Sequence, residues 1–119
     1  MRYILLLSLL VPLVLAASSC WAQTGVPPAA VQLANKQADR MRDSLGLNAS
    51  QRQRIYDANI YLHNCKTQAW SQYSTDRTRL QQELQTIENR RDSLYNVILG
   101  SPDKYQLYKA KKATIVKTN

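Results

Sequence analysis

Apolar residues recur at alternating steps of three and four along most of the chain, and this spacing constrains the fold more than any other feature. Because an α-helix makes one turn in about 3.6 residues, residues so spaced line one face of a helix. An alternating apolar and polar pattern, which would indicate a strand, does not extend over any length of the chain. The sequence therefore predicts an all-α fold. The periodic positions form three groups: Val31, Ala34, Ala38, Met41 and Leu45; Ile55, Ala58, Leu62, Cys65 and Ala69; and Tyr73, Leu80, Leu84, Ile87, Leu94 and Ile98.

Residues that stop and start helices separate the first two groups. The first helix is expected from about Pro28 to Leu45, with Gly46 as its stop and Leu47 folded back over its last turn. Asn48 suits the N-cap of the second helix, and Gln51 can reach back to the cap amide, as in a capping box. We therefore expect a tight, capped turn between these helices.

The second and third groups are out of step, because eleven residues separate Ala69 from Leu80. Such an offset marks a stutter in one continuous helix or a break, and residues 74–76 (Ser-Thr-Asp) favour caps and turns. One helix over residues 49–99 would be about 75 Å long, too long for this small chain to cover. We expect a bend or short break there, and an antiparallel helical hairpin of long helices with short flanking helices.

A further helix start lies near the C-terminal end of the chain. Gly100 suits a helix stop, Ser101 an N-cap, and Pro102 the first position of a last helix that runs to about Ala113. A domain of this size buries only about 60 to 65% of its unfolded surface, so a core shared between two copies would stabilise it. We therefore expect a homodimer.

The first 22 residues have the pattern of a secretory signal peptide. Arg2 supplies a positive start, residues 4–15 are largely apolar, and residues 16–22 are mostly small. The apolar stretch is shorter than the roughly 20 residues that a membrane span needs. We therefore expect export to the periplasm and cleavage after Ala22.

Cleavage at that point would leave a flexible leader over residues 23–28 and a helical domain over residues 29–119. The alternative is a lipoprotein, in which Cys20 is acylated and becomes the first residue. Membrane attachment is expected only in that case.

The two helix starts carry a resemblance to a known family. Leu47-Asn48-Ala49-Ser50-Gln51 and Ser101-Pro102-Asp103-Lys104-Tyr105 resemble the Leu-Thr-x-x-Gln motifs of the Spy/CpxP family of small periplasmic helical proteins. The resemblance extends over roughly residues 36–112. The residues that match the motif are Leu47, Asn48, Gln51, Ser101, Pro102, Asp103 and Tyr105.

This resemblance implies an ATP-independent chaperone or envelope-stress adaptor, a cradle-like homodimer that holds non-native proteins on its concave face. The CpxP side of the family also implies a two-component sensor kinase as a partner.

A surface that combines Lys and Arg with Tyr and Leu can attract acidic segments and then hold apolar ones. By residue type alone, the client-binding candidates are Arg52, Ile55, Tyr56, Tyr61, Arg77, Arg79, Arg90 and Arg91. For each of them the alternative is a solvated basic face or a tyrosine packed between helices.

The chain is basic, with a formal net charge of +8 that falls to +7 when Arg2 leaves with the signal peptide. Lysines gather near the C-terminal end, a pattern that can indicate nucleic-acid binding. Export would separate the protein from nucleic acid, so we expect no nucleic-acid partner. The charge points instead to acidic clients or anionic lipid.

Residues 23–119 offer little for catalysis, since they contain one His, one Cys, no glycine-rich phosphate loop and no nucleophile motif. His63 and Cys65 are two residues apart, about 200° around a helix, and cannot chelate one ion together. We expect neither enzymatic activity nor a cofactor nor a metal site. Cys65 falls on an apolar stripe, where a buried residue is the ordinary explanation. The alternative is an intermolecular disulfide between two Cys65 thiols in an oxidising compartment.

Two other functions remain open. Some members of the Spy/CpxP family are linked with metal stress, so a periplasmic metal-stress sensor or resistance protein is one alternative. Such a sensor would need several His, Cys or Met ligands, and Met41 is the only Met after residue 22. The other alternative is a structural coiled-coil envelope protein that binds one native partner rather than many non-native ones.

Overall fold

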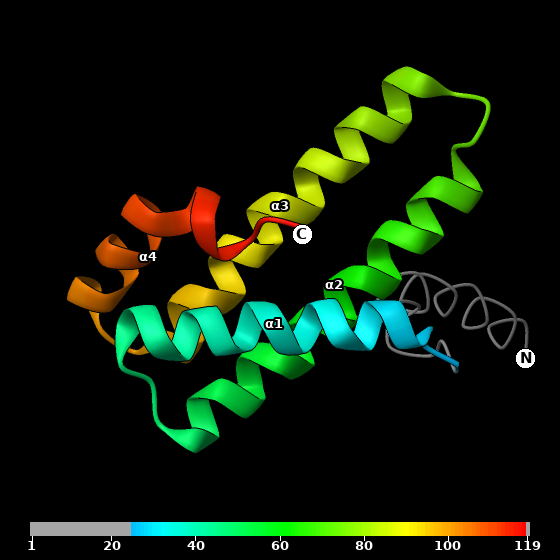
Figure 1. The fold of residues 1–119 in the computed structure, drawn as a ribbon. Coiled ribbons are helices and arrows are strands. Elements are labelled where there is room, and N and C mark those ends of the chain that lie inside the picture. Colours follow the sequence, from blue (N-terminus) through cyan, green and yellow to red (C-terminus); the bar gives the residue numbers. More distant parts are fainter. Residues whose placement is uncertain (1–24, 119) are drawn as a thin grey trace, which may run out of the picture.

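The computed structural model describes residues 25–118, and this part of the chain contains four helices (Figure 1). They are α1 (Pro28–Leu45), α2 (Ala49–Gln72), α3 (Arg77–Leu99) and α4 (Pro102–Ile115). The all-α prediction is confirmed for these residues, among which no strand occurs. Within the same residues, no helix is both long enough and apolar enough to cross a membrane.

The predicted signal peptide, the cleavage after Ala22 and the acylation of Cys20 all lie outside the described residues. The predicted leader lies inside them only in part. Residues 25–27 are not helical, whereas Pro28, expected to close the leader, is already the first residue of α1. A proline is well suited to that position because its missing N–H is not needed in the first turn.

The turn between α1 and α2 has the expected chemistry. Gly46 adopts a left-handed conformation with φ of 66°, and its N–H donates to the carbonyl of Arg42 at 2.8 Å. Leu47 follows, buried over the end of α1, as a helix-terminating motif requires. Asn48 Oδ1 accepts from the Gln51 N–H at 2.8 Å, and Gln51 Oε1 accepts from the Asn48 N–H at 3.1 Å. The capping box is therefore confirmed.

The break between the two long helices is also confirmed. Asp76 caps α3 by accepting a hydrogen bond from the Arg79 N–H at 3.0 Å. The last helix starts as expected, with Ser101 Oγ accepting from the Lys104 N–H at 3.5 Å. It ends at Ile115, two residues later than the sequence suggested. Ile115 is fully buried, so tertiary packing extends the helix beyond its local end signals.

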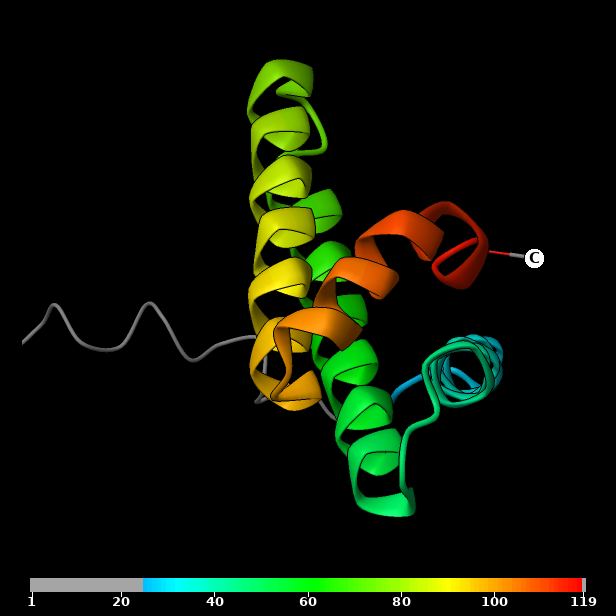
Figure 2. The ribbon, with the colours of Figure 1, turned by 90° about the vertical axis from the view of Figure 1, so that its left-hand side faces the viewer.

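The two long helices lie side by side and run in opposite directions, and both short helices pack on one side of them (Figure 2). The chain leaving α4 is held by α1. Gln37 Nε2 donates to the Val116 carbonyl at 3.1 Å, and Arg40 Nη1 donates to the Lys117 carbonyl at 2.8 Å. Among the described residues, no helix covers the other side of the α2–α3 pair.

Two groups of buried apolar side chains hold the helices together. The larger group, here called the base core, joins all four helices. The smaller group, the tip core, joins only α2 and α3, so the outer half of the pair is stabilised by these two helices alone. The base core consists of Ala38, Met41, Leu45, Leu47, Ile55, Ala58, Tyr95, Ile98, Leu99, Tyr108 and Ile115. The tip core consists of Tyr61, Leu62, Cys65, Ala69, Leu80 and Ile87.

Candidate functional site

An apolar groove lies on the side of the α2–α3 pair that α1 and α4 leave open. Its volume is about 310 Å³, and we call it the outer groove. Val97 projects from it with 69% of its surface exposed, which is unusual for a large apolar side chain in a small domain. The groove is lined by Arg54, Asp57, Ala58 and Tyr61 of α2 and by Leu94, Val97 and Ile98 of α3.

Helix geometry explains why this groove faces away from α1. Asn59 marks the side of α2 that faces α1, because its Nδ2 donates to the carbonyl of Ala34 at 3.2 Å. Asp57 and Tyr61 are each two residues from Asn59, about 160 to 200° around the helix. Their side chains therefore lie on the opposite side of α2.

A cation contacts Tyr61, one of the residues that line the outer groove. The Arg90 guanidinium carbon is 6.0 Å from the centre of the Tyr61 ring, and its Nη1 donates to the Tyr61 hydroxyl at 3.2 Å. The same nitrogen is 3.6 Å from Cys65 Sγ. Burial lowers the pKa of Arg90, but the electron-rich Tyr61 and Cys65 groups raise it above its ordinary value. The groove thus combines apolar surface with one basic and one acidic side chain in its lining, Arg54 and Asp57, and with the permanent positive charge of Arg90 beside Tyr61.

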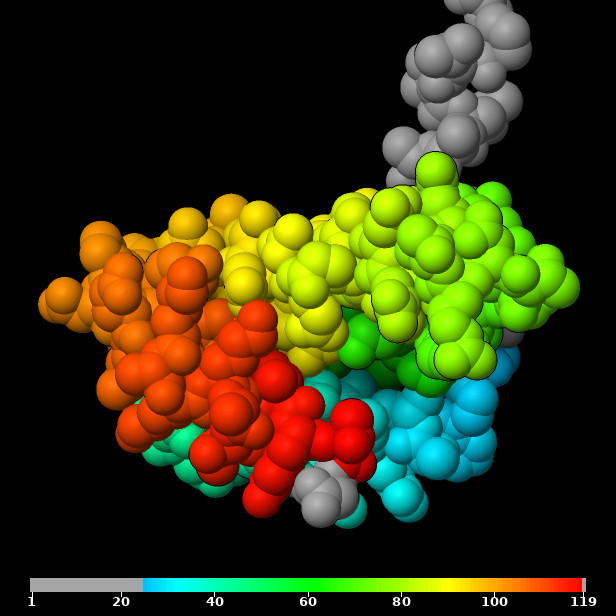
Figure 3. Space-filling view, turned by 90° about the horizontal axis from the view of Figure 1, so that it is seen from above, coloured from blue at the N-terminus to red at the C-terminus, as the bar shows by residue number. Residues whose placement is uncertain are grey.

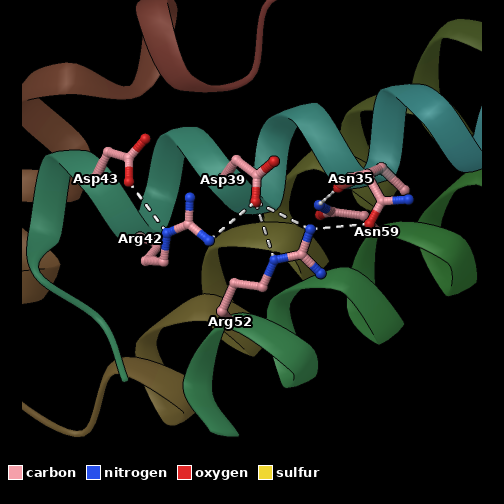
Figure 4. Close-up of polar contacts among 7 residues, drawn as sticks. Asn35, Asp39, Arg42, Asp43, Arg52 and Asn59 are labelled. Atoms are coloured by element: carbon pink, nitrogen blue, oxygen red, sulfur yellow. Dashed lines mark hydrogen bonds and ion pairs between the residues drawn. The ribbon is translucent and has the colours of Figure 1, made fainter. Parts of the chain in front are cut away.

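Arg52 and Tyr56, also predicted to bind clients, lie elsewhere. Arg52 fastens α2 to α1, because its Nε and Nη2 donate to Asp39 Oδ1 at 3.1 and 3.0 Å. Its Nη2 also donates to Asn35 Oδ1 at 2.9 Å, within a cluster that Arg42 extends on α1 (Figure 4). Tyr56 packs against the base core, and the centre of its ring is 5.9 Å from the Arg52 guanidinium carbon. These two residues form part of the α1–α2 contact.

Ile55 and Arg91 are two further client-binding candidates, and the structure places both inside, as the periodic apolar stripe predicts for Ile55. Ile55 has no exposed surface, and Arg91 is only 5% exposed. Arg91 lies four residues after Ile87 and four before Tyr95, which are both buried, so it shares the inner face of α3. Neither residue belongs to an open client surface in this structure.

Arg77 and Arg79 lie at the far end of the α2–α3 pair and are exposed. The Arg79 guanidinium is 5.4 Å from the centre of the Tyr73 ring. Arg77 borders a separate hollow of about 330 Å³ beside Trp70, which is 58% exposed. The predicted cations therefore do not form one face. Of the eight predicted residues, only Tyr61 lines the outer groove, and Arg90 contacts Tyr61.

The motif residues have structural contacts. Gln51 Nε2 donates to the carbonyls of Ile98 and Leu99, at 3.5 and 3.4 Å, and so ties the start of α2 to the end of α3. At the second start, the Tyr105 ring packs 6.0 Å from the Tyr108 ring, and Lys104 Nζ donates to the Gly46 carbonyl at 3.4 Å. The two helix starts are therefore joined at one end of the molecule. The remaining motif residues form the turns themselves: Leu47 and Asn48 before α2, and Ser101, Pro102 and Asp103 at the start of α4.

In the part of the chain that the structure describes, no group of three or more His, Cys, Asp or Glu could hold a metal ion. His63 Nε2 lies 3.4 Å from the Thr67 hydroxyl. Cys65 belongs to the tip core and is 3% exposed. A disulfide between two chains would require this thiol to become exposed.

Sequence reasoning missed most of the outer groove. The periodic apolar pattern includes Ala58, Leu94 and Ile98, but it predicts only an interior position for them. The signal that could have found the groove is Val97, an apolar residue that falls off the periodic stripe.

Comparison of the chain with protein-family models, with curated proteins and with solved structures finds no match.

Proposed function

We propose that this protein is an exported, ATP-independent chaperone or envelope-stress adaptor of the periplasm, which binds unfolded or partly folded proteins. The observation that carries the proposal is the outer groove, where exposed Val97 lies in an apolar hollow, and Tyr61 in its lining contacts Arg90. The signal peptide predicted over residues 1–22 supports the location, and the resemblance of the chain to the Spy/CpxP family supports the class.

The groove has the chemistry that weak, sequence-tolerant binding needs. Burial of apolar surface contributes about 25 cal/mol per Å² and demands no particular sequence. Arg54 in the lining and Arg90 beside Tyr61 outnumber the single acidic side chain of the lining, Asp57, and this excess of positive charge accelerates the approach of acidic segments. Clients therefore bind first through charge and then through apolar side chains that cover Val97.

In this proposal the antiparallel α2–α3 pair is a helical hairpin, and two copies assemble as a cradle-like homodimer. The uncovered side of the pair then forms the client-binding face. As a stress adaptor, the protein would also report on the envelope to a two-component sensor kinase. Size-exclusion chromatography with light scattering measures the oligomeric state and tests the dimer directly.

The test is aggregation of a chemically denatured model protein, diluted into buffer with and without residues 23–119 and without ATP. Val97→Ser should reduce the suppression of aggregation several-fold, since it removes the most exposed apolar group of the groove. Leu107→Ser is the matched control, because Leu107 is 40% exposed on α4, away from the groove. No suppression by the folded wild type, or equal loss in both variants, would refute the proposal.

A second pair of variants tests the charge. Arg54→Ser with Arg90→Ser should weaken capture of acidic clients and reduce its salt dependence. Lys109→Ser with Lys111→Ser removes the same charge from α4, where both side chains are exposed. Equal effects of the two double variants would mean that net charge, and not the groove, controls binding.

The structural alternative, a coiled-coil envelope protein with one native partner, is supported by the small volume of the groove. A single fixed contact could fill it. The two functions differ in what they bind, so the same aggregation assay separates them: a structural protein leaves non-native model proteins unprotected. Nothing among the described residues favours the metal-stress alternative.

A further inference from the structure

A second hollow lies on the other side of the molecule, between α1, the α2–α3 pair and the chain that follows α4. Its volume is about 340 Å³, and we call it the inner pocket. Figure 3 shows the hollow between α3, in yellow, α1, in blue, and the red C-terminal end, with green α2 visible at its floor.

The two walls of the inner pocket differ in character. Ala30, Leu33 and Ala34 of α1, together with Val116, form an apolar wall. The facing wall carries ionisable side chains from two helices: His63 and Lys66 of α2, and Glu88 and Arg91 of α3. A pocket with one apolar and one charged wall matches a ligand that is itself amphipathic.

The charged wall holds more cation than anion. Lys66 Nζ is 3.0 Å from Glu88 Oε1, and Arg91 Nη2 is 3.5 Å from the same oxygen. One carboxylate is therefore shared by two cations. Burial raises the pKa of Glu88, but Arg91 and Lys66 lower it below its ordinary value, so the carboxylate stays ionised. The three groups together carry a charge of +1.

Arg91 is the unusual member of this wall. A guanidinium has five N–H donors, and buried arginines normally have acceptors for them. With 5% of its surface exposed, Arg91 has Glu88 as its only ion-pair partner among residues 25–118, and the buried Nε has no hydrogen-bond partner. The pocket wall thus holds one buried donor, Arg91 Nε, that has no acceptor.

The two amide side chains of the pocket, Asn59 and Gln37, are already hydrogen-bonded. Asn59 donates to the Ala34 carbonyl and accepts from the Tyr95 hydroxyl. Gln37 Nε2 donates to the carbonyl of Val116 at 3.1 Å and so holds the apolar wall in place. These amides shape the pocket, whereas Arg91 keeps a buried donor without an acceptor, and Lys66 is paired with Glu88 and partly exposed.

We propose that the inner pocket binds a small amphipathic carboxylate. Its carboxylate group accepts hydrogen bonds from Lys66 and Arg91, and its short hydrocarbon chain lies along Leu33, Ala34 and Val116. The volume is near the lower end of the usual 300 to 1,000 Å³ for ligand sites, which suits a small molecule rather than a protein segment. The apolar wall favours a carboxylate with a chain over a bare inorganic anion.

Three probes separate the parts of this proposal: hexanoate, hexanol and inorganic phosphate, each titrated into the full mature chain and followed by backbone amide NMR. Hexanoate should shift the amides of Leu33, Ala34 and Val116 in a saturable way, while Val97 in the outer groove stays unchanged. Hexanol lacks the charge and phosphate lacks the chain, so each should bind at least about tenfold more weakly.

Two substitutions change the net charge of the charged wall in opposite directions. Lys66→Gln should weaken hexanoate binding about tenfold, because it removes one donor. Glu88→Gln should strengthen binding, because it removes the carboxylate that competes for both cations. The matched controls are Lys111→Gln and Glu83→Gln, which make the same charge changes outside the pocket and should leave affinity within about twofold. Circular dichroism verifies that each variant is folded.

Absence of saturable hexanoate binding by the folded wild type would overturn the proposal. Equal affinity for hexanol would overturn the role of Lys66 and Arg91, and equal affinity for phosphate would overturn the role of the apolar wall. Glu88→Gln and Glu83→Gln variants with the same affinity would likewise refute competition by the internal carboxylate.

Discussion

The carboxylate of Asp92 on α3 accepts a hydrogen bond of 2.8 Å from the hydroxyl of Tyr108 on α4. Tyr108 is fully buried. The same oxygen accepts from Lys112 Nζ at 2.8 Å. Burial raises the pKa of Asp92, but the hydrogen bonds from Lys112 and Tyr108 lower it below its ordinary value of 3.8. This carboxylate therefore joins α4 to α3 most strongly when it is ionised.

Replacing Asp92 should make the protein less stable and less sensitive to acid. A carboxyl group with a lowered pKa contributes stability above pH 3.8, and this contribution is lost as the pH falls through the folded-state pKa. Asp92→Asn should cost about 1 to 3 kcal/mol near pH 6 and flatten the loss of stability below about pH 4. Urea unfolding at both pH values measures this. Asp43→Asn, at a 70% exposed side chain, is the control, and an unchanged acid slope in Asp92→Asn would contradict the assignment.

Ionisation of the buried Tyr95 hydroxyl at alkaline pH should unfold the base core. Burial is the main cause that raises the pKa of Tyr95 from 10.0 to about 12. A raised pKa means that the stabilisation is complete below pH 10.0 and is lost as the pH rises toward 12. Tyrosinate absorbance and helicity should therefore change together in this window. Ordinary titration of all tyrosines near pH 10 with helicity retained would contradict this expectation.

Asn48→Ala should destabilise the protein by about 1 kcal/mol, because it removes the side chain that caps α2. Thermal unfolding measures the loss. Asn96→Ala, at an exposed position inside α3, is the matched control and should be neutral or slightly stabilising, since alanine is the better helix former. Equal changes in melting temperature would mean that the cap contributes nothing.

Gly46→Ala should lower the free energy of unfolding by about 1 kcal/mol or more, because alanine is strained in the left-handed backbone conformation of Gly46. Gly46 has φ of 66°, and an added Cβ would have no heavy atom within 4 Å, so no steric clash contributes. Gly46→Asn should cost less, since asparagine tolerates the left-handed conformation better than alanine. Chemical denaturation of the two variants side by side gives the comparison, and a greater loss for Asn would exclude this explanation.

Cys65 should react with thiol reagents only when the tip core opens. The thiol is 3% exposed, so modification of the native protein should be far slower than modification in denaturant. The same burial predicts that the oxidised protein runs as a single chain on non-reducing electrophoresis. A disulfide-linked dimer under native conditions would instead support the intermolecular pairing considered from the sequence.

The helix ends could be predicted from the sequence because local chemistry determines them. Gly46, Asn48 and Gly100 act within a few residues of their own positions, and the structure has each helix end where they indicate. The end of α4 is different, since burial of Ile115 against distant residues extends it.

Burial on α3 was predicted only in part, because this helix contacts neighbours on two sides. Its periodic stripe faces α2, whereas Tyr95 and Leu99 belong to the base core that α4 completes. That second contact depends on how α4 folds back, which no local pattern reveals. The interior position of Arg91 was missed for the same reason, and the outer groove required knowing which side α1 and α4 leave bare.

The hydrogen bonds from α1 to the chain after α4 have a consequence for folding order. Gln37 and Val116 are 79 residues apart in the sequence, and closing so long a loop costs more entropy than joining adjacent helices. We therefore expect neighbouring helices to associate first and this long-range contact to form last. Local opening should begin at the same place, which would release the C-terminal end before either long helix unfolds.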